Sequence, residues 1–459
     1  MKRFFYILLT PIAFLLAACH GDDPEGSKAQ QHYGRTVLVY MAMQNSLGAN
    51  SHHKADSAEI ANGMCYIPQN DRMLLFIDDK DKPRIYELSK ALSETNPKTG
   101  LPYGPKLLKK WDSDISSASA ATVREVLEYM KKNYDSDSYG LVIGSHATGW
   151  LPAARETTAS SASRRQAVRP RKTIGVDVGP DGSMANDKGV AGSVPDQIAV
   201  EELATAIGAS GVHPDFILFD ACLMQNIEVA FALRNVTEYI IASPISISAE
   251  GAYYTDMMHN GFFTADVVDV ARSYVAYYQG KGSIPYTDGY GTVLSCIRTA
   301  GLETFAVLMH QAIGEACNRL GGNSDDMVEA LKRADMSDAL VYHTYCSSYY
   351  YRPHFYDLLS AMEALGTDVV LMRQLRQLVS QIVVYQGASD SFWIGPYRTI
   401  QVMPKDENDW CGVSMFVPQQ IYTDYAPYCI YGDLNEDFRK TEWCKYVFGS
   451  FSGDQSGTF

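Results

Sequence analysis

The sequence has no C-x-x-C pair, no apolar run of 18 residues, and fewer basic than acidic residues. Its nine cysteines are too sparse and irregular in 459 residues for a disulfide scaffold. Without C-x-x-C pairs a structural zinc site is not expected either. The 53 acidic residues outnumber the 39 basic ones and give a net charge of −14. Because nucleic-acid binding needs a positive surface, nucleic acid is not expected as a partner.

The N-terminus carries a targeting signal. Lys2 and Arg3 precede an apolar stretch, 4–18, which is shorter than the roughly 20 residues of a membrane span. This pattern predicts a signal peptide over residues 1–18. The segment Leu16-Ala17-Ala18-Cys19 resembles a bacterial lipobox, which implies cleavage before Cys19 and lipidation of its thiol. The alternative is an ordinary signal peptide.

Residues 19–33 are polar and glycine-containing, and predict a lipidated tether. We therefore expect an exported bacterial lipoprotein, anchored to the membrane through its lipid, at the cell envelope or cell surface. The acidic residues Asp22, Asp23 and Glu25 resemble the export signals of some surface lipoproteins.

Short apolar runs alternate with helical patterns between residues 34 and 285. The runs predict strands that are buried on both faces, as in a parallel sheet; they are 36–41, 73–77, 139–144, 216–220 and 239–242. The helical patterns cover 118–133, 195–209 and 225–235. Alternation of strand and helix predicts a three-layer α/β domain.

The pattern changes after residue 285. We expect a smaller mixed α/β unit over 286–459, with strands near 291–297 and 410–417 and helices near 303–320 and 368–386. No internal repeat is evident.

Two predicted strands end in residues that can carry out chemistry. His146 follows the strand 139–144, and Cys222 follows the strand 216–220 just before a predicted helix. Ligands of open α/β sheets bind at the carboxyl ends of strands, where the two side chains would share one crevice. A helix N-terminus lowers the pKa of a cysteine, so we expect a reactive thiol. In the alternative interpretation, Cys222 is a core residue and His146 a satisfied polar one.

Several motifs resemble those of the clostripain family of cysteine peptidases, in the caspase-like clan. The segment Asp220-Ala221-Cys222-Leu223-Met224 matches that family fully, and Glu228-Val229-Ala230 continues the match. The segment 411–418 is similar to a later family strand. The chain departs from the family at Ala147-Thr148, where glycines are usual, and at 243–254, where Ser-Pro-Ile-Ser-Ile-Ser replaces acidic, Trp-containing sequence.

The resemblance implies a caspase-like fold with a mostly parallel sheet, and a cysteine endopeptidase that acts on peptides or proteins. Cys222 would be the nucleophile and His146 the general acid/base. The backbone N–H groups of Cys222 and Ala147 would form the oxyanion hole. Cleavage after Arg, and less after Lys, would need a carboxylate in the pocket: Asp220 by position or Glu250 by resemblance. Alternatively, Asp220 holds loop amides that shape the site.

The stretch 153–172 is rich in basic residues and lies between His146 and Cys222. Because clostripain-like enzymes are processed there, self-cleavage is expected. The candidate sites are Arg155, Arg164, Arg165, Arg169, Arg171 and Lys172. The alternative is a surface loop with solvated side chains.

A second function stays open: a catalytically silent caspase-like lipoprotein that binds protein or glycan partners at the cell surface. No cofactor is expected and no metal ligand is assigned. The acidic stretch with Asp177, Asp181 and Asp187 leaves calcium as a weakly supported alternative.

Overall fold

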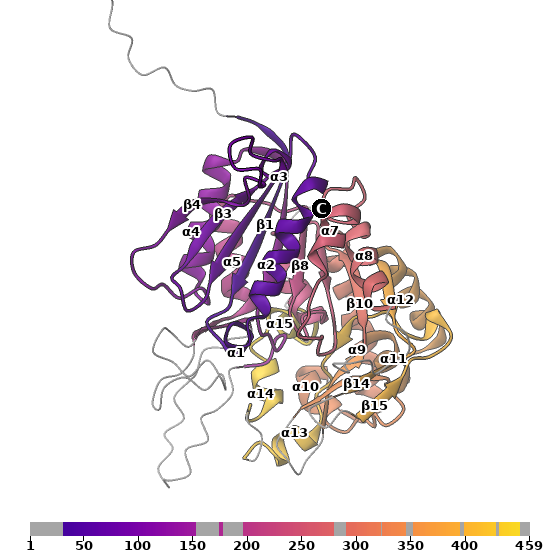
Figure 1. The fold of residues 1–459 in the computed structure, drawn as a ribbon. Helices are drawn as coiled ribbons and strands as arrows, with labels where there is room; N and C mark the ends of the chain where they lie inside the picture. Colours follow the sequence, from indigo (N-terminus) through magenta and orange to yellow (C-terminus); the bar gives the residue numbers. More distant parts are fainter. Residues whose placement is uncertain are drawn as a thin grey trace, which may run out of the picture. The chain divides into compact units, whose positions relative to one another are not determined.

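A nine-stranded mixed sheet forms the centre of the protein in a computed structural model (Figure 1). Its strands, in spatial order, are β13 (Val383–Ala388), β10 (Val293–Arg298), β9 (Tyr239–Ala242), β8 (Phe216–Asp220), β5 (Ser136–Gly144), β1 (Tyr33–Ala42), β2 (Arg72–Asp78), β3 (Arg84–Leu88) and β4 (Lys106–Lys110). The structure describes residues 31–152, 174–177, 196–279, 291–322, 324–345, 352–394, 399–427 and 431–449. Residues 32–459 form one compact unit.

The five predicted strands of the first half are all present and form the parallel middle of the sheet, β9-β8-β5-β1-β2. Both edges are antiparallel: β10 and β13 extend one side, and β3 and β4 extend the other. The sequence analysis did not predict β3 and β4, because their residues are partly exposed and lack the continuous apolar run of the central strands.

Helices cover both faces of this sheet. The main ones are α2 (His52–Gly63), α4 (Ala120–Asn133), α5 (Val200–Ser210), α6 (Ile227–Leu233), α7 (Tyr254–Asn260), α8 (Val268–Gln279), α9 (Leu302–Arg319) and α12 (Val369–Ile382). Alternate residues of β1 enter different cores: Val37 and Val39 pack with α2, α7 and α8, whereas Leu38 and Tyr40 pack with α4 and α5. The three-layer α/β sandwich expected from the sequence is therefore confirmed.

The expected boundary between residues 285 and 286 lies outside the described residues. Beyond it, β10 and β13 continue the central sheet, while three antiparallel strands form a smaller sheet: β11 (Val341–Tyr345), β12 (Arg352–Asp357) and β16 (Ser414–Met415). Two further strand pairs are β6 (Ile174–Asp177) with β7 (Asp196–Ile198), and β14 (Ser391–Ile394) with β15 (Thr399–Val402).

The remaining elements are short. They are α1 (Ser46–Ala49), α3 (Lys90–Ser93), α10 (Met327–Leu331), α11 (Leu358–Ala364), α13 (Gln420–Asp424), α14 (Leu434–Phe438), α15 (Glu442–Val447) and the 3₁₀ turns Met64–Tyr66, Ser324–Asp326 and Glu407–Asp409.

The bounds of the predicted elements differ from those in the structure, and three of these differences change the type or extent of an element. The helix predicted over 368–386 ends at Ile382 and continues directly as β13, because the apolar periodicity does not distinguish the last helical turn from an edge strand. The helix predicted over 195–209 begins only at Val200, after β7. The strand predicted over 410–417 is reduced to the two residues of β16.

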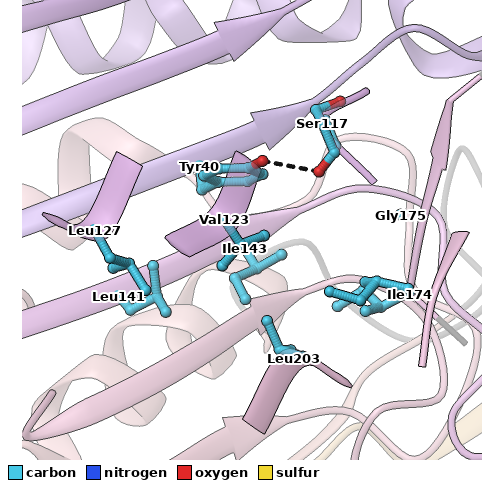
Figure 2. A pocket seen from close by; sticks show the side chains of 11 residues that line it. Tyr40, Ser117, Val123, Leu127, Leu141, Ile143, Ile174, Gly175 and Leu203 are labelled. Atoms are coloured by element: carbon cyan, nitrogen blue, oxygen red, sulfur yellow. Dashed lines mark hydrogen bonds between the residues drawn. The ribbon is translucent and has the colours of Figure 1, made fainter. Parts of the chain in front are cut away.

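A small apolar cavity of about 20 Å³ lies between the sheet and the helices α4 and α5. Leu141 and Ile143 of β5 line it from one side, and Leu127 and Leu203 from the helices (Figure 2). The cavity has about the volume of one water molecule and few polar groups, so it is a packing gap rather than a ligand site. Ile174 of β6 also lines it, which anchors this strand to the core.

The buried acid Glu228 joins α6 to the segment that follows β16. Its Oε1 accepts a hydrogen bond from the backbone N–H of Phe416 at 2.9 Å, and its side chain is almost fully buried. Burial raises the pKa of Glu228 to about 8, although the N–H of Phe416 opposes this shift. The carboxyl group is therefore mostly protonated in the folded protein at neutral pH, whereas it is ionised in the unfolded chain.

This raised pKa predicts a pH-dependent loss of stability. The folded state holds a proton that the unfolded state releases above its ordinary pKa of 4.5, so the free energy of unfolding falls as pH rises toward about 8. Glu228→Gln keeps the acceptor for Phe416 and removes the titration. The melting temperature of the variant should therefore exceed that of the wild type by a margin that grows from pH 5 to pH 8, as followed by circular dichroism.

Glu303→Gln, at an exposed glutamate, is the control for loss of a carboxylate at the surface. Each pKa unit corresponds to about 1.4 kcal/mol, so the effect is of the order of a few kcal/mol. A constant difference between wild type and Glu228→Gln from pH 5 to pH 8 would contradict the assignment.

Candidate active site

The register of two neighbouring parallel strands places His146 and Cys222 at equivalent positions. Gly144 of β5 pairs with Asp220 of β8, and each candidate residue follows its strand by two positions. Adjacent strands are separated by about 4.8 Å, so both residues leave the sheet at the same carboxyl edge, side by side in the strand order. Both are partly exposed there, whereas most of their neighbours are buried.

The loop after His146 packs against the turn after Cys222. Gly149 has φ +69°, and a Cβ at this position would lie 2.6 Å from the carbonyl oxygen of Leu223 and 2.5 Å from Nδ2 of Asn226. Only glycine allows this close approach. Leu223, directly after the nucleophile candidate, also has a positive φ of 63°, a strained conformation for a residue with a side chain. Strain of this kind gathers at functional sites.

His146 is held from two sides. Its Nε2 lies 2.8 Å from Oγ of Ser46 in α1, and its carbonyl oxygen accepts a hydrogen bond from Gly175 N–H in β6 at 3.1 Å. Asn45 caps α1 by accepting from Leu47 N–H. Ser46 was not predicted from the sequence. The polar pair Asn45-Ser46 soon after the strand 36–41, which neighbours β5, could have indicated it.

The thiol of Cys222 lies under a loop. Its sulfur accepts a hydrogen bond from the backbone N–H of Ile247 at 3.4 Å. Burial raises the pKa of Cys222, and the negative charge of Asp220 adds to this shift. The N–H of Ile247 and the hydroxyl of Ser246 act in the opposite direction.

The expectation that a helix N-terminus lowers the pKa of Cys222 is therefore wrong. α6 begins only at Ile227, and its N-cap is Asn226. The residues directly after Cys222 form a turn instead, so the thiol lies several residues outside the first helical turn, where the helix dipole has faded. The resting thiol is consequently protonated at neutral pH.

Asp220 holds the loop that follows β9. Its carboxylate accepts hydrogen bonds from Ala252 N–H at 3.0 Å and from the Tyr254 hydroxyl at 3.0 Å. A Cβ on Gly251 would lie 2.7 Å from this carboxylate, which shows how closely the loop approaches. Burial raises the pKa of Asp220 to about 6. These are the contacts expected if Asp220 shapes the site through loop amides.

Two acidic residues of α2 lie behind Asp220. Glu59 accepts from Tyr254 N–H through Oε2 at 3.0 Å, so it holds the same loop. Burial raises the pKa of Asp56 to about 9, and the charges of Asp220 and Glu59 add to it. Glu250, in contrast, is exposed, and its Oε2 lies 3.5 Å from the Tyr277 hydroxyl. Asp56 and Glu59 were not predicted as site residues, because α2, the helix that carries them, has no clear apolar periodicity.

Ala147, directly after His146, is buried and forms a bridge with Ile174 of β6. Asp177 accepts from Ser117 N–H at 2.9 Å, and within the described ranges no three His, Cys, Asp or Glu residues are arranged to hold a metal ion. Among these same residues no helix is both long and apolar enough to cross a membrane. The sites that lie outside the described residues are Cys19, Arg155, Arg164, Arg165, Arg169, Arg171, Lys172, Asp181 and Asp187.

Solved structures with a similar fold are known. A secreted C11 cysteine protease from Bacteroides thetaiotaomicron, in complex with an irreversible peptide inhibitor, is similar with a TM-score of 0.66 and 21% identity, over 90% of this chain and 98% of that chain. An inactive zymogen C11 protease from Parabacteroides distasonis is similar with a TM-score of 0.65 and 25% identity, also over 90% of this chain and 98% of that one. No curated protein sequence matches.

A model of the clostripain family matches residues 39–164 and 187–447, which is most of the chain and includes both strand ends of the site. The family resemblance and the caspase-like fold expected from the sequence are thereby confirmed, and they favour an enzyme over a silent binding protein. The chain belongs to the clostripain family and is a cysteine peptidase.

Proposed function

We propose that the protein is an endopeptidase in which Cys222 and His146 form the catalytic dyad. The observation that carries this proposal is the pairing of Gly144 with Asp220, which brings the two strand ends together. Because the thiol is protonated at rest, His146 takes the proton as the sulfur attacks the peptide carbonyl carbon. The C–N bond then breaks, and the imidazolium gives its proton to the leaving amine. Water activated by His146 hydrolyses the thioester.

The backbone N–H groups of Cys222 and Ala147 are the proposed donors to the oxyanion. Each belongs to a segment with limited freedom: Leu223 is strained next to Cys222, and Ala147 is buried beside β6. Rigid donors cost no reorganisation when negative charge develops on the substrate oxygen. An alanine supplies the same N–H as a glycine, so the departure from the family motif at residue 147 preserves this group.

The dyad predicts the effect of removing either member. Purified Cys222→Ala should have no activity toward peptide amides, and His146→Ala should lose about a hundredfold or more in kcat, because proton transfer is no longer assisted. Hydrolysis of fluorogenic peptides measures both effects. Circular dichroism and melting temperature control for folding. Turnover in pure Cys222→Ala above the level of a mock preparation would exclude Cys222 as the nucleophile.

We propose that basic residues, preferably Arg, are accepted on the N-terminal side of the cleaved bond. The support is electrostatic. Asp220 lies two residues before Cys222, Asp56 and Glu59 lie behind it, and Glu250 is exposed on the neighbouring loop. A guanidinium group would relieve the repulsion among these acids and pair with a carboxylate.

Substrates with Arg or citrulline at P1 test this pocket, because the two side chains have nearly the same shape and differ in charge. If Asp220 binds the substrate, Asp220→Asn should lower the preference for Arg over citrulline by about tenfold or more. If Asp220 only holds Ala252 and Tyr254, kcat/KM should fall equally for both. Glu250→Gln is the paired variant, and loss of Arg preference there alone would move the pocket role to Glu250.

We propose that the segment 153–172, which lies outside the described residues, is cut by the enzyme itself. One relative is described as an inactive zymogen, which supports a precursor form in the family. After a cut, β5 would belong to one fragment and β8 to the other, but their strand pairing, and the bond from Gly175 N–H to His146, would hold them together.

Wild type should therefore show two fragments on a denaturing gel and one peak in gel filtration. Cys222→Ala should stay intact, because it lacks the nucleophile. Mass spectrometry should place the new ends at one of the basic residues between Arg155 and Lys172. Intact chains in both proteins, or equal cleavage in both, would rule out self-processing.

We also propose that the mature chain is anchored to a bacterial membrane through lipid on Cys19, at the cell envelope or surface. The lipobox-like segment carries this proposal, and a neighbour described as secreted supports export. Two or three acyl chains anchor a protein far better than one. Cys19→Ser should move the protein from the membrane to the soluble fraction of cells. Equal membrane association of both forms would exclude the lipid anchor.

A further inference from the structure

The loop after β9 runs along the turn that carries the nucleophile. Leu223 N–H donates to the carbonyl oxygen of Ile245 at 3.0 Å, and Gln225 N–H donates to that of Ser243 at 3.1 Å. Ile247 N–H reaches the sulfur of Cys222 at 3.4 Å. Ser246 stands between Ile245 and Ile247, in the part of the chain that departs from the family pattern. Its backbone position next to the sulfur is therefore fixed by both neighbours.

A second histidine, His343 of β11, lies on the other side of Ser246. Its Nε2 is 3.3 Å from Oγ of Ser246, and only 3% of its surface is exposed. Its ring packs near Phe355, with the ring centroids 6.4 Å apart. Burial lowers the pKa of His343 to about 3, so the imidazole is neutral at every pH at which the enzyme would work. A neutral imidazole carries one N–H group.

We propose that Ser246, held by His343, is a positioning residue that donates its hydroxyl hydrogen to the Cys222 thiolate. The inference rests on the proposed role of Cys222 as nucleophile. A thiolate only accepts hydrogen bonds, so Ser246 must use its single hydrogen toward sulfur. The hydroxyl oxygen then accepts from His343, which requires the tautomer with hydrogen on Nε2. In this series of hydrogen bonds, His343 therefore donates to Ser246, and Ser246 donates to Cys222.

These hydrogen bonds offset the effect of burial, which disfavours the thiolate of Cys222. Desolvation and the charge of Asp220 raise the pKa of Cys222, and Tyr274 is a further titratable group near the sulfur. His146, at the end of the neighbouring strand, is another titratable group of the site. Ile247 N–H and Ser246 O–H supply two donors to the anion from a single loop. Hydrogen bonds to charged groups are about twice as strong as neutral ones, so their loss should be measurable.

The test measures the thiol directly. In Ser246→Ala, the rate of alkylation by iodoacetamide should reach half of its maximum about one pH unit higher than in the wild type. The kcat for a peptide substrate should fall about tenfold at neutral pH, with KM within about twofold, because the bound substrate does not contact Ser246 in this proposal. Ser246→Thr, which keeps the hydroxyl, should restore most of both values.

A comparison of single and double variants tests the role of His343. His343→Phe should shift alkylation in the same direction, and the double variant with Ser246→Ala should be no worse than Ser246→Ala alone, because His343 acts through Ser246. Thr344→Val, a buried change on the same strand, is the matched control and should leave the alkylation profile unchanged. If His343→Phe does not fold, the two Ser246 variants decide alone.

A folded Ser246→Ala with unchanged alkylation midpoint and kcat would overturn the inference. This failure is distinct from failure of the dyad. If Cys222→Ala is inactive while Ser246→Ala equals the wild type, the nucleophile stands and only the positioning role falls. If Cys222→Ala is active, the dyad itself falls.

Discussion

The parallel pairing of β5 with β8 is the constraint on which the site depends. A shift of this register by one residue would send His146 or Cys222 to the opposite side of its strand, because side chains alternate along a strand. Burial of both faces prevents such a shift: Val142 and Leu218 pack on one side of the sheet, and Leu141 and Ile217 on the other. The two apolar cores thereby fix the geometry of the site, although these residues are all buried inside the protein.

The same burial works against the nucleophile. A thiol at the edge of a dry three-layer core loses solvation as an anion, and the adjacent Asp220 adds repulsion. The protein offsets this with hydrogen-bond donors from a loop rather than with a helix dipole, since α6 starts too late. The neighbouring acids Asp220 and Asp56 likewise have raised pKa values. A partly buried cysteine beside acids with raised pKa values forms an environment that a cationic substrate side chain would stabilise.

The sequence predicted the elements whose residues are apolar throughout. The central strands, α4 and α9 were found, because continuous or helical periodicity leaves few alternatives. The antiparallel strands β3 and β4 and the helix α2 were not predicted, because half-exposed residues carry a weaker pattern. His146 and Cys222 could be named from strand ends and motif. The sequence could not identify Ser46, Asp56 and His343 as site residues, because they reach the site from distant parts of the chain through tertiary packing.

The loop 243–254 connects the nucleophile, the acidic residue Asp220 and the helix α2. It contacts Cys222 through Ile247 N–H, Asp220 through Ala252 N–H, and α2 through Tyr254 N–H. A change in any of these contacts would alter the thiol and the acidic group together, since one short backbone segment carries all three. This is also one of the two segments in which the chain departs from the family pattern, whereas the motif 220–224, which contains Cys222, matches it fully. The sheet therefore fixes where the nucleophile lies, while the loop sets its environment and is itself anchored in both cores through Ile245 and Ala252.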